Sequence, residues 1–532
     1  MQDGLWSAQR RALTGGLVLT ITFVAAEALA VVTVMPLVAR SLHGLSLYGF
    51  VFSAFMLGTI VGIVAAGRAA DQRGPALPYI TGIVVFAIGL TIAGLAPSMP
   101  VLVAGRALQG LGAGAVPSVA YVAIGRSLPE RLRAKMMAIM STAWVAPGLA
   151  GPAVSAEVAR LFGWRWVFLG LLPFIALTGP FAIPALVRLG RPKTPAPAGH
   201  RLIDGIGVAA AAGLVLGGLT LAADAGGTSG SAATATGPVK LASAQAMSAV
   251  GHAGGAARHA GMISARLTAD VWDARIWPIL GGAVLIAAGL AIGLPLLRRL
   301  LPPGTLTAKY GLPATILTRS LLTFAFFGSD AFVTLTITIL RHRSPVVAGL
   351  AVTGSTLAWT AGAWIQARMN TRWESRRLVR IGLSIILIGI AGLAIMLWDG
   401  VSVGEGIAAW TVAGFGMGLC YSPISLLMLA AAPAGREGWA SASLNLADVL
   451  GSAIGIGIGG AAISAAVSLH WPLATGIAVA FALTATAGIT ALVVTRRLPL
   501  RGLPSAPDKT PELNPELTHL AQSAEHHPAE PP

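Results

Sequence analysis

The stretch Gly67-Arg68-Ala69-Ala70-Asp71-Gln72-Arg73-Gly74 separates two apolar runs, at residues 47–67 and 77–96. Each run has about the 20 apolar residues that a helix needs to cross a bilayer. The charged stretch between them therefore marks a membrane surface, with one crossing before it and one after it. Taken alone, the same stretch also fits a tight polar turn without any further role.

The whole chain has the composition of a membrane protein. Of its 532 residues, 55% are hydrophobic and only 11% are charged, and the mean hydropathy is +0.77. Soluble domains average about 25% charged residues, so this composition excludes a soluble enzyme. A net charge of +16 would suggest nucleic acid in a soluble protein, but here the basic residues lie between apolar runs. We expect a lipid bilayer around the chain and no nucleic-acid partner.

Reading the chain for runs of spanning length gives fourteen predicted transmembrane helices. They lie near residues 12–38, 47–67, 77–96, 99–125, 135–160, 166–188, 204–223, 277–297, 313–340, 346–367, 379–398, 404–431, 438–468 and 472–495. The predicted fold class is therefore an all-α membrane protein. The sequence divides these helices into six, then two, then six.

The distribution of lysine and arginine predicts the orientation of the chain. Cytoplasmic loops retain positive charge. With a cytoplasmic N-terminus, the cytoplasmic segments hold 25 Lys and Arg residues and the external loops hold 9. We therefore expect both termini in the cytoplasm.

Identities at an offset of 300 residues indicate a weak internal repeat between the first and last six helices. The pairs are Gly49/Gly349, Leu57/Leu357, Gly62/Gly362, Arg68/Arg368, Gly82/Gly382, Ile88/Ile388 and Gly89/Gly389. Parallel repeats of this kind relate the two halves of many transporters. The predicted divisions are a six-helix bundle at 1–190, two additional helices at 191–300 with an external Gly/Ala/Ser-rich loop at 225–272, a six-helix bundle at 301–498, and a disordered cytoplasmic tail at 499–532.

Several short motifs resemble those of one transporter family. Residues 67–74 resemble the G-x-x-x-D-R-x-G signature of the major facilitator superfamily, and residues 106–114 match the R-x-x-Q-G-x-G-x-G pattern of its fourteen-helix drug:proton antiporters. Residues 148–152, with Gly148, Gly151 and Pro152, are similar to the antiporter motif of the same family. The resemblance implies two six-helix bundles plus two additional helices, fourteen in total, around a central cavity that opens alternately to each side. It also implies a bacterial inner membrane and a conformational gate at Gly67, Asp71, Arg73 and Gly74.

Two acidic residues within predicted helices are candidate proton carriers. Glu27 is about 15 residues into the first helix, near the membrane midplane, and stands before Pro36 with a spacing similar to an acidic-to-proline motif of the family. Its alternative role is a structural carboxylate paired with Arg106. Asp330, in the outer half of the ninth helix, is a candidate for a second proton or for a cationic substrate. Its alternative is a polar residue satisfied by hydrogen bonds near Thr334 and Thr336.

The remaining polar and aromatic residues within helices suggest a substrate cavity. An arginine inside a helix usually faces a charged partner or a wet cavity, although Arg106 could instead extend toward the outer surface. The candidate cavity residues are Arg106, Gln109, Trp144, Trp359, Tyr421, Asn445 and Asp448. For the aromatic residues and for Asp448, helix packing is the competing interpretation. The sequence predicts no metal site, because all nine histidines lie in loops, helix ends or the tail, and it predicts no cofactor.

These observations predict a secondary transporter rather than an enzyme. The resemblance implies proton-coupled export of amphiphilic or cationic drug-like compounds, so the expected partners are a small-molecule substrate, protons and the bilayer; the sequence identifies no protein partner. One alternative is an exporter of a single metabolite or lipid. An alternative of another class is a membrane sensor or scaffold that transports nothing.

Overall fold

The computed structural model describes residues 4–7, 10–43, 47–191, 202–215, 217–218, 280–370, 372–433 and 435–499. The predicted external loop at 225–272 and the predicted tail from residue 500 onward lie outside the described residues. Every regular element of the described chain is a helix. The predicted all-α fold class is therefore confirmed.

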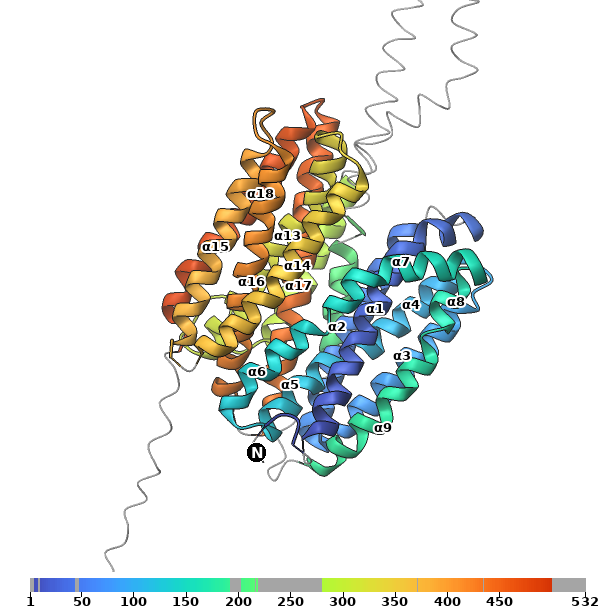
Figure 1. Ribbon diagram of the computed structural model, residues 1–532, viewed down its shortest axis with the longest axis vertical. Coiled ribbons are helices and arrows are strands. Elements are labelled where there is room, and N and C mark those ends of the chain that lie inside the picture. Colours follow the sequence, from blue (N-terminus) through green and yellow to red (C-terminus); the bar gives the residue numbers. More distant parts are fainter. Residues whose placement is uncertain are drawn as a thin grey trace, which may run out of the picture.

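Two bundles of helices lie side by side (Figure 1). The first bundle contains α1 (Arg11–Ser41), α2 (Tyr48–Arg73), α3 (Ala76–Gly94), α4 (Met99–Ala113), α5 (Ala115–Ser127), α6 (Glu130–Thr142), α7 (Val145–Phe162), α8 (Arg165–Leu169) and α9 (Leu172–Arg188). The second contains α13 (Leu312–Leu335), followed by the π-helical turn η2 (Thr336–Leu340), then α14 (Pro345–Met369), α15 (Ser375–Ile395), α16 (Val403–Ala431), α17 (Glu437–Ser468), α18 (Leu473–Val494) and the 3₁₀ turn η3 (Thr495–Arg497).

Local sequence signals explain where some of these helices begin and end. The hydroxyl of Ser402 accepts a hydrogen bond from the Glu405 amide at 3.2 Å, and the Glu405 carboxylate accepts one from the Ser402 amide at 3.1 Å. This reciprocal capping satisfies two backbone N–H groups at the start of α16. At its C-terminal end, α2 stops at Arg73. The next residue, Gly74, has a φ of 85°, which is accessible to glycine at little cost.

The two bundles repeat one packing scheme. In the first bundle α4 packs against α2 and α3, and α1 packs against α7 and α9. In the second bundle α16 packs against α14 and α15, and α13 packs against α17 and α18. Each helix named in the first bundle thus has the same neighbours as the corresponding helix in the second bundle. This arrangement is what a parallel repeat of two six-helix halves requires.

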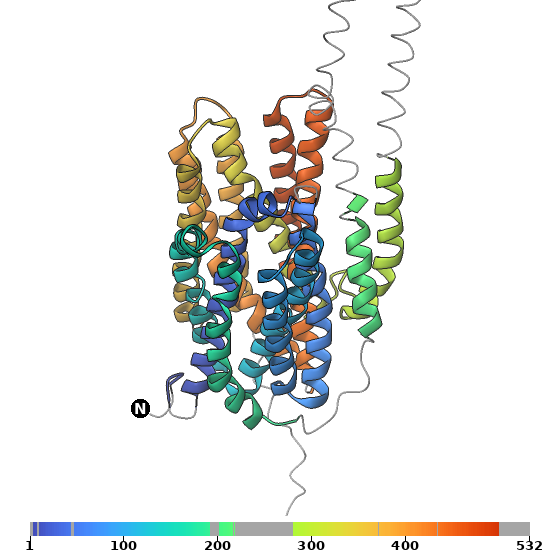
Figure 2. The same ribbon diagram turned by 90° about the vertical axis from the view of Figure 1, so that its right-hand side faces the viewer.

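Contacts between the bundles involve only a few helices among the described residues. Helix α17 of the second bundle packs against α2 and α5 of the first, and α14 packs against α6 and α7. One hydrogen bond of this contact joins the Trp364 indole to the Thr142 hydroxyl at 2.8 Å. Two further helices, Leu202–Val215 and Leu280–Leu300, lie outside both bundles (Figure 2).

Within the described residues, eleven helices are long and apolar enough to cross a membrane, or twelve if the bent pair Glu130–Gly151 and Ala153–Phe162 forms one span. The two remaining predicted spans coincide with α14, which has 25 residues, and with the shorter apolar helix Leu202–Val215. A total of fourteen crossings agrees with this arrangement and stays a prediction.

Candidate functional site

A buried polar cluster joins α1 to α4 in the first bundle. Glu27 is 0% exposed, Arg106 3% and Gln109 0%. The Arg106 guanidinium donates to Glu27 Oε1 in an ion pair, and also to Gln109 Oε1 at 2.9 Å, while Gln109 Nε2 donates to Glu27 Oε1 at 3.2 Å. On its other side, the Arg106 guanidinium carbon lies 4.3 Å from the centre of the Phe55 ring.

This arrangement accounts for an arginine within a membrane helix. Arg106 points inward to Glu27 rather than outward to the membrane surface, because a buried charge is stabilised by an opposite charge and by hydrogen bonds. The pairing is nevertheless incomplete. Among the described residues, neither Glu27 Oε2 nor Arg106 Nε has a hydrogen-bond partner. A buried carboxylate oxygen without a donor can take up a proton without breaking an existing bond.

Asp330 of α13 faces a different environment in the second bundle. Its Oδ1 accepts a hydrogen bond from the Trp410 indole of α16 at 2.8 Å. No Lys or Arg side chain of the described chain forms an ion pair with it at 4 Å or less, and the expected contacts with Thr334 and Thr336 are absent there: Thr336 donates to the Phe332 carbonyl instead, at 2.7 Å. The partner of Asp330 is therefore an uncharged donor.

An aromatic cluster extends from the indole partner of this carboxylate to a second ion pair. The rings of Phe326 and Trp410 stack at 4.9 Å, and Trp359 lies 5.7 Å from Phe326 and 5.2 Å from Tyr421. Trp359 and Tyr421, both predicted to line a cavity, thus belong to one aromatic cluster on α13, α14 and α16.

Arg319 and Asp448 form the charged end of this cluster. Arg319, which is 0% exposed, donates to both carboxylate oxygens of Asp448, the second at 2.9 Å, and to the Tyr421 carbonyl at 2.7 Å. The Tyr421 hydroxyl also donates to Asp448, at 3.0 Å. The bidentate pair explains how α17 can carry Asp448 within the membrane. Sequence reasoning had placed Asp448 without identifying Arg319 as its partner.

The predicted gate residue Asp71 contacts the beginning of α17. Its carboxylate accepts hydrogen bonds from the backbone amides of Gly438, at 2.6 Å, and Trp439, at 2.7 Å. These are amides of the first helical turn, where the helix dipole favours an anion. Arg126 of α5 lies close by and donates to Glu437 at 3.1 Å. Asp71 thereby links the first bundle to the second.

The two gate glycines have different roles: Gly67 allows two helices to approach each other closely, and Gly74 allows the backbone to turn. A methyl group on Gly67 would lie 2.5 Å from the Ala442 side chain and 2.6 Å from the Gly438 carbonyl oxygen. Gly67 therefore lets α2 and α17 touch, whereas Gly74 supplies the positive φ at the end of α2. Arg73 is exposed at this end.

The predicted antiporter motif lies where α7 bends. The axis changes direction by 47° between Gly151 and Ala153, with Pro152 between them; the side chain of Pro152 lies outside what the structure describes, as does that of Pro36. Gly148 faces Thr356 of α14, and Gly151 faces Leu29 of α1, both at ordinary contact distance. The motif thus touches both bundles.

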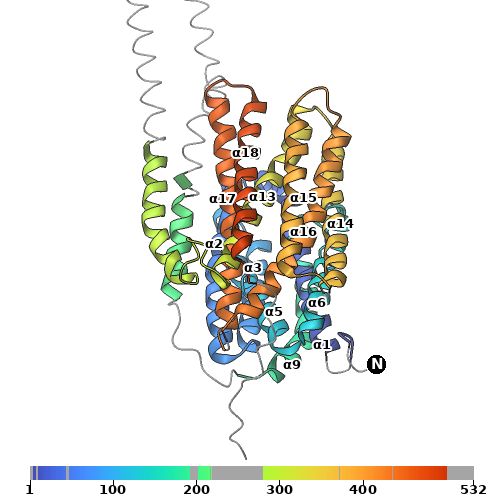
Figure 3. The same ribbon diagram turned by 90° about the vertical axis from the view of Figure 1, so that its left-hand side faces the viewer.

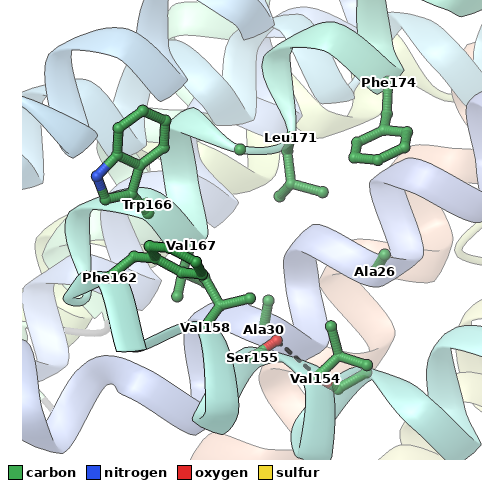
Figure 4. Close-up of a pocket in the computed structure, with 12 residues that line it drawn as sticks. Ala26, Ala30, Val154, Ser155, Val158, Phe162, Trp166, Val167, Leu171 and Phe174 are labelled. Atoms are coloured by element: carbon green, nitrogen blue, oxygen red, sulfur yellow. Dashed lines mark hydrogen bonds between the residues drawn. The ribbon is translucent and has the colours of Figure 1, made fainter. Parts of the chain in front are cut away.

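Beside this bend lies an apolar cavity of about 500 Å³ (Figure 4). Its walls come from α1, α7, α8 and α9, with Phe162, Trp166 and Phe174 among them. The hydroxyl of Ser155 points into the region but donates to the carbonyl of Gly151 at 2.7 Å. None of the residues predicted for the substrate cavity lines this one. It is therefore distinct from both polar clusters.

Two predicted cavity residues lie away from the clusters. Trp144, between α6 and α7, is 44% exposed. Asn445 is buried in α17 and donates to the carbonyl of Ser441 in the preceding turn, at 2.8 Å. Trp410 was not predicted at all, although it stands 304 positions after Arg106 on the corresponding helix. The repeat in the sequence has an offset of 300, at which Arg106 corresponds to Gly406, so the sequence carries no signal for Trp410.

Comparison with known proteins agrees with this architecture. Residues 17–302, more than half of the chain, match the family model described as Major Facilitator Superfamily. This chain belongs to that family.

Relatives within the Major Facilitator Superfamily include a protein described as a probable multidrug-efflux transporter of Mycobacterium tuberculosis, 25% identical over 484 residues, which cover 90% of this chain and 92% of that protein. The multidrug transporter protein MdtP of Bacillus subtilis is 29% identical over 166 residues, 31% of each chain. Among solved structures, the human organic anion transporter MFSD10 aligns with a TM-score of 0.62 at 12% identity, over 91% of this chain and 99% of that one.

A bacterial homologue of the iron transporter ferroportin, in an outward-facing state, aligns with a TM-score of 0.61 at 13% identity, over 92% of this chain and 98% of that one. These structural likenesses concern the fold. Together with the family and the apolar helices, they make this Major Facilitator Superfamily member a multi-pass integral membrane transporter of small molecules, and not an enzyme.

Proposed function

We propose that this transporter exports amphiphilic or cationic compounds in exchange for inward-moving protons, by alternating access. The observation that carries the proposal is a carboxylate inside the first helix of each half, the fully buried Glu27 in α1 and the partly buried Asp330 in α13. A titratable group in the membrane interior is rarely placed without a functional reason. The multidrug-efflux description of the mycobacterial relative supports export and drug-like substrates.

In this proposal Glu27 alternates between two states, one ionised and paired with Arg106 and one protonated. With the carboxyl group ionised, Arg106 and Gln109 both donate to Oε1. Protonation of Oε2, which has no donor among the described residues, weakens the attraction for the guanidinium. Arg106 then becomes free to change contacts. A proton entering at Glu27 is thereby coupled to a change in the packing of α1 and α4.

Asp330 exchanges a proton for a cationic substrate. Its uncharged partner Trp410 leaves the negative charge uncompensated, and Trp410 belongs to an aromatic cluster with Phe326 and Trp359. Aromatic faces and a carboxylate together attract an organic cation. Because proton and cation compete for one carboxylate, binding the substrate expels the proton. The apparent affinity for a cation should therefore rise with pH.

Asp71 serves as part of the cytoplasmic gate. Its two hydrogen bonds to the first turn of α17 stabilise the conformation in which α2 and α17 are in contact. The Arg126–Glu437 pair adds a second link at the same place. Alternating access then requires these links to break once in each cycle.

The test is transport by the purified protein in liposomes with an imposed pH gradient and a panel of cationic, neutral and anionic compounds. We expect flux of cationic amphiphiles that stops when an ionophore dissipates the gradient. Flux of one metabolite or lipid alone would support the narrower exporter. Gradient-independent flux would reject coupling, and no flux of any compound would favour a sensor or scaffold.

A further inference from the structure

The two helices between the halves, Leu202–Val215 and Leu280–Leu300, are here called the inserted pair. They lie beside α2 and α17 (Figure 3). None of the sequence motifs that define the two bundles falls in this region. Its contacts nevertheless connect it to both halves, and to the place where the proposed gate lies.

The first helix of the inserted pair packs on α2. A methyl group at Gly205 would lie 3.0 Å from the Val64 side chain, and one at Gly213 would lie 3.3 Å from Leu57. Small residues at these positions allow the close approach that membrane helices use for packing. Through these contacts the inserted pair is attached to the first half.

The second helix packs on the first and ends on the other half. Gly289 lies against the backbone of Ala211. At the end of the helix, the carbonyl of Leu300 accepts two hydrogen bonds from α17, from the Trp439 indole at 3.2 Å and from the Ser443 hydroxyl at 3.3 Å. Leu300 is only 3% exposed, so an unsatisfied carbonyl there would be destabilising.

The segment after Leu300 is also fixed to the second half. Arg497, at the end of the last helix, donates to the Thr307 carbonyl at 2.8 Å, and its own carbonyl accepts from the Gly311 amide at 3.1 Å. The inserted pair is thus anchored at α2 on one side and at α17 on the other, and the segment that follows it is anchored at the end of α18.

Trp439 takes part in both systems. Its backbone amide donates to Asp71 of the first half, and its indole donates to Leu300 of the inserted pair. We propose that the inserted pair is a brace across the cytoplasmic gate, with Trp439 and Ser443 as positioning residues that hold α17 in the gate-closed arrangement. The inference rests on the proposed gate function of Asp71.

The mechanical consequence follows from the two attachments. If α2 and α17 separate, either the hydrogen bonds at Leu300 or the packing of Gly205 and Gly213 on α2 must be lost. An interaction shifts a conformational equilibrium only when it differs between the two states. Both attachments oppose opening of the gate. Weakening either the hydrogen bonds at Leu300 or the packing on α2, whichever is lost on opening, should therefore increase the population of the open gate.

The experiment measures the gate directly by electron paramagnetic resonance distances between two spin labels. Cysteines replace Lys135 of α6 and Arg377 of α15, which are exposed and belong to different halves, in a chain whose sole cysteine is removed by Cys420→Ser. The variants are Trp439→Phe, Ser443→Ala, their combination, and Gly205→Leu. Trp398→Phe is the matched control, since Trp398 is 71% exposed and lies at the opposite end of the helices.

We expect Trp439→Phe or Ser443→Ala to raise the fraction of long distances by roughly fivefold, the change that one net hydrogen bond of about 1 kcal/mol corresponds to, and the combined variant or Gly205→Leu to raise it at least as much. The control should match the wild type in both distances and melting temperature. The other variants should remain folded, with melting temperatures somewhat below the wild-type value, because the buried Leu300 carbonyl loses its donors or the packing on α2 is altered. Unchanged distances in both the combined variant and Gly205→Leu would overturn the brace. The measurement needs no substrate, so it remains decisive if proton-coupled transport is not found.

Discussion

The two halves of the molecule each place a carboxylate on their first helix and surround it differently. Glu27 and Asp330 stand 303 positions apart on α1 and α13, and their respective partners Arg106 and Trp410 stand 304 positions apart on α4 and α16. The first carboxylate faces a guanidinium, and the second faces an indole N–H. One backbone scaffold thus supports two electrostatic environments.

The difference assigns different tasks to the two positions. An ion pair that is fully buried holds two helices together, and removing either partner leaves an uncompensated charge. A carboxylate with an uncharged partner can lose its negative charge, by protonation, without that consequence. Glu27 should therefore couple protonation to helix packing, whereas Asp330 should couple it to the binding of a cation.

The largest effect is expected from Glu27→Gln. The amide keeps the shape but removes titration and leaves the buried Arg106 without its counter-charge, which in other proteins destabilises by about 3–5 kcal/mol. Gradient-driven transport should be abolished, as flux in liposomes with an imposed pH gradient will show. Glu27→Asp keeps the charge and should retain partial function.

A double variant separates the structural part of that effect. Adding Arg106→Gln to Glu27→Gln removes both charges, so the melting temperature should recover while gradient-driven transport stays absent. Recovery of transport in the double variant would show that Glu27 is a structural partner of Arg106 and nothing more. Wild-type flux in the single variant would move proton coupling to Asp330.

Asp330→Asn should have a smaller effect on stability and a selective effect on transport. The amide oxygen can still accept from the Trp410 indole, so we expect a melting temperature close to that of the wild type. Cationic compounds should lose affinity and neutral compounds should not. The check is binding of both classes at two pH values, since the wild-type pH dependence for cations should disappear. Equal losses for both classes would contradict a charge-specific role.

The comparison also extends to the end of the second helix of each half. Asp71, in the last turn of α2, corresponds at the 300-residue offset to Thr371, which lies outside the described residues. Asp71→Asn weakens two hydrogen bonds to the first turn of α17, worth roughly 0.3–1 kcal/mol through the helix dipole. Turnover should fall several-fold with substrate affinity nearly unchanged. A large loss of affinity at normal turnover would reject the gate role.

Trp410→Phe should have the smallest effect on transport. It removes only the indole donor from Asp330 and keeps an aromatic ring against Phe326, so stability should fall by about 1 kcal/mol. Without its donor, the ionised Asp330 is less stable and the proton is held more tightly. Cation binding should then need a higher pH, which a pH titration of binding will measure. Trp398→Phe, at an exposed position, is the control.

The sequence alone determined the membrane class, the order of the helices and the family. Hydrophobic runs of spanning length report a property of each segment by itself, because lipid requires every helix to satisfy its own backbone. The motifs likewise identified Asp71, Arg106 and Glu27 from local spacing. These features do not depend on which distant helices meet.

The sequence offered Arg106 as a possible partner of Glu27, but only the tertiary structure decided the other partners. It paired Arg319 with Asp448 and Trp410 with Asp330, residues 129 and 80 positions apart, and it brought Leu300 to Trp439. Such pairs form because buried charges and donors must find partners within a few ångströms, and which partner lies within reach depends on how the helices pack. That information resides in three-dimensional contacts among α13, α16 and α17, and no periodicity within one helix contains it.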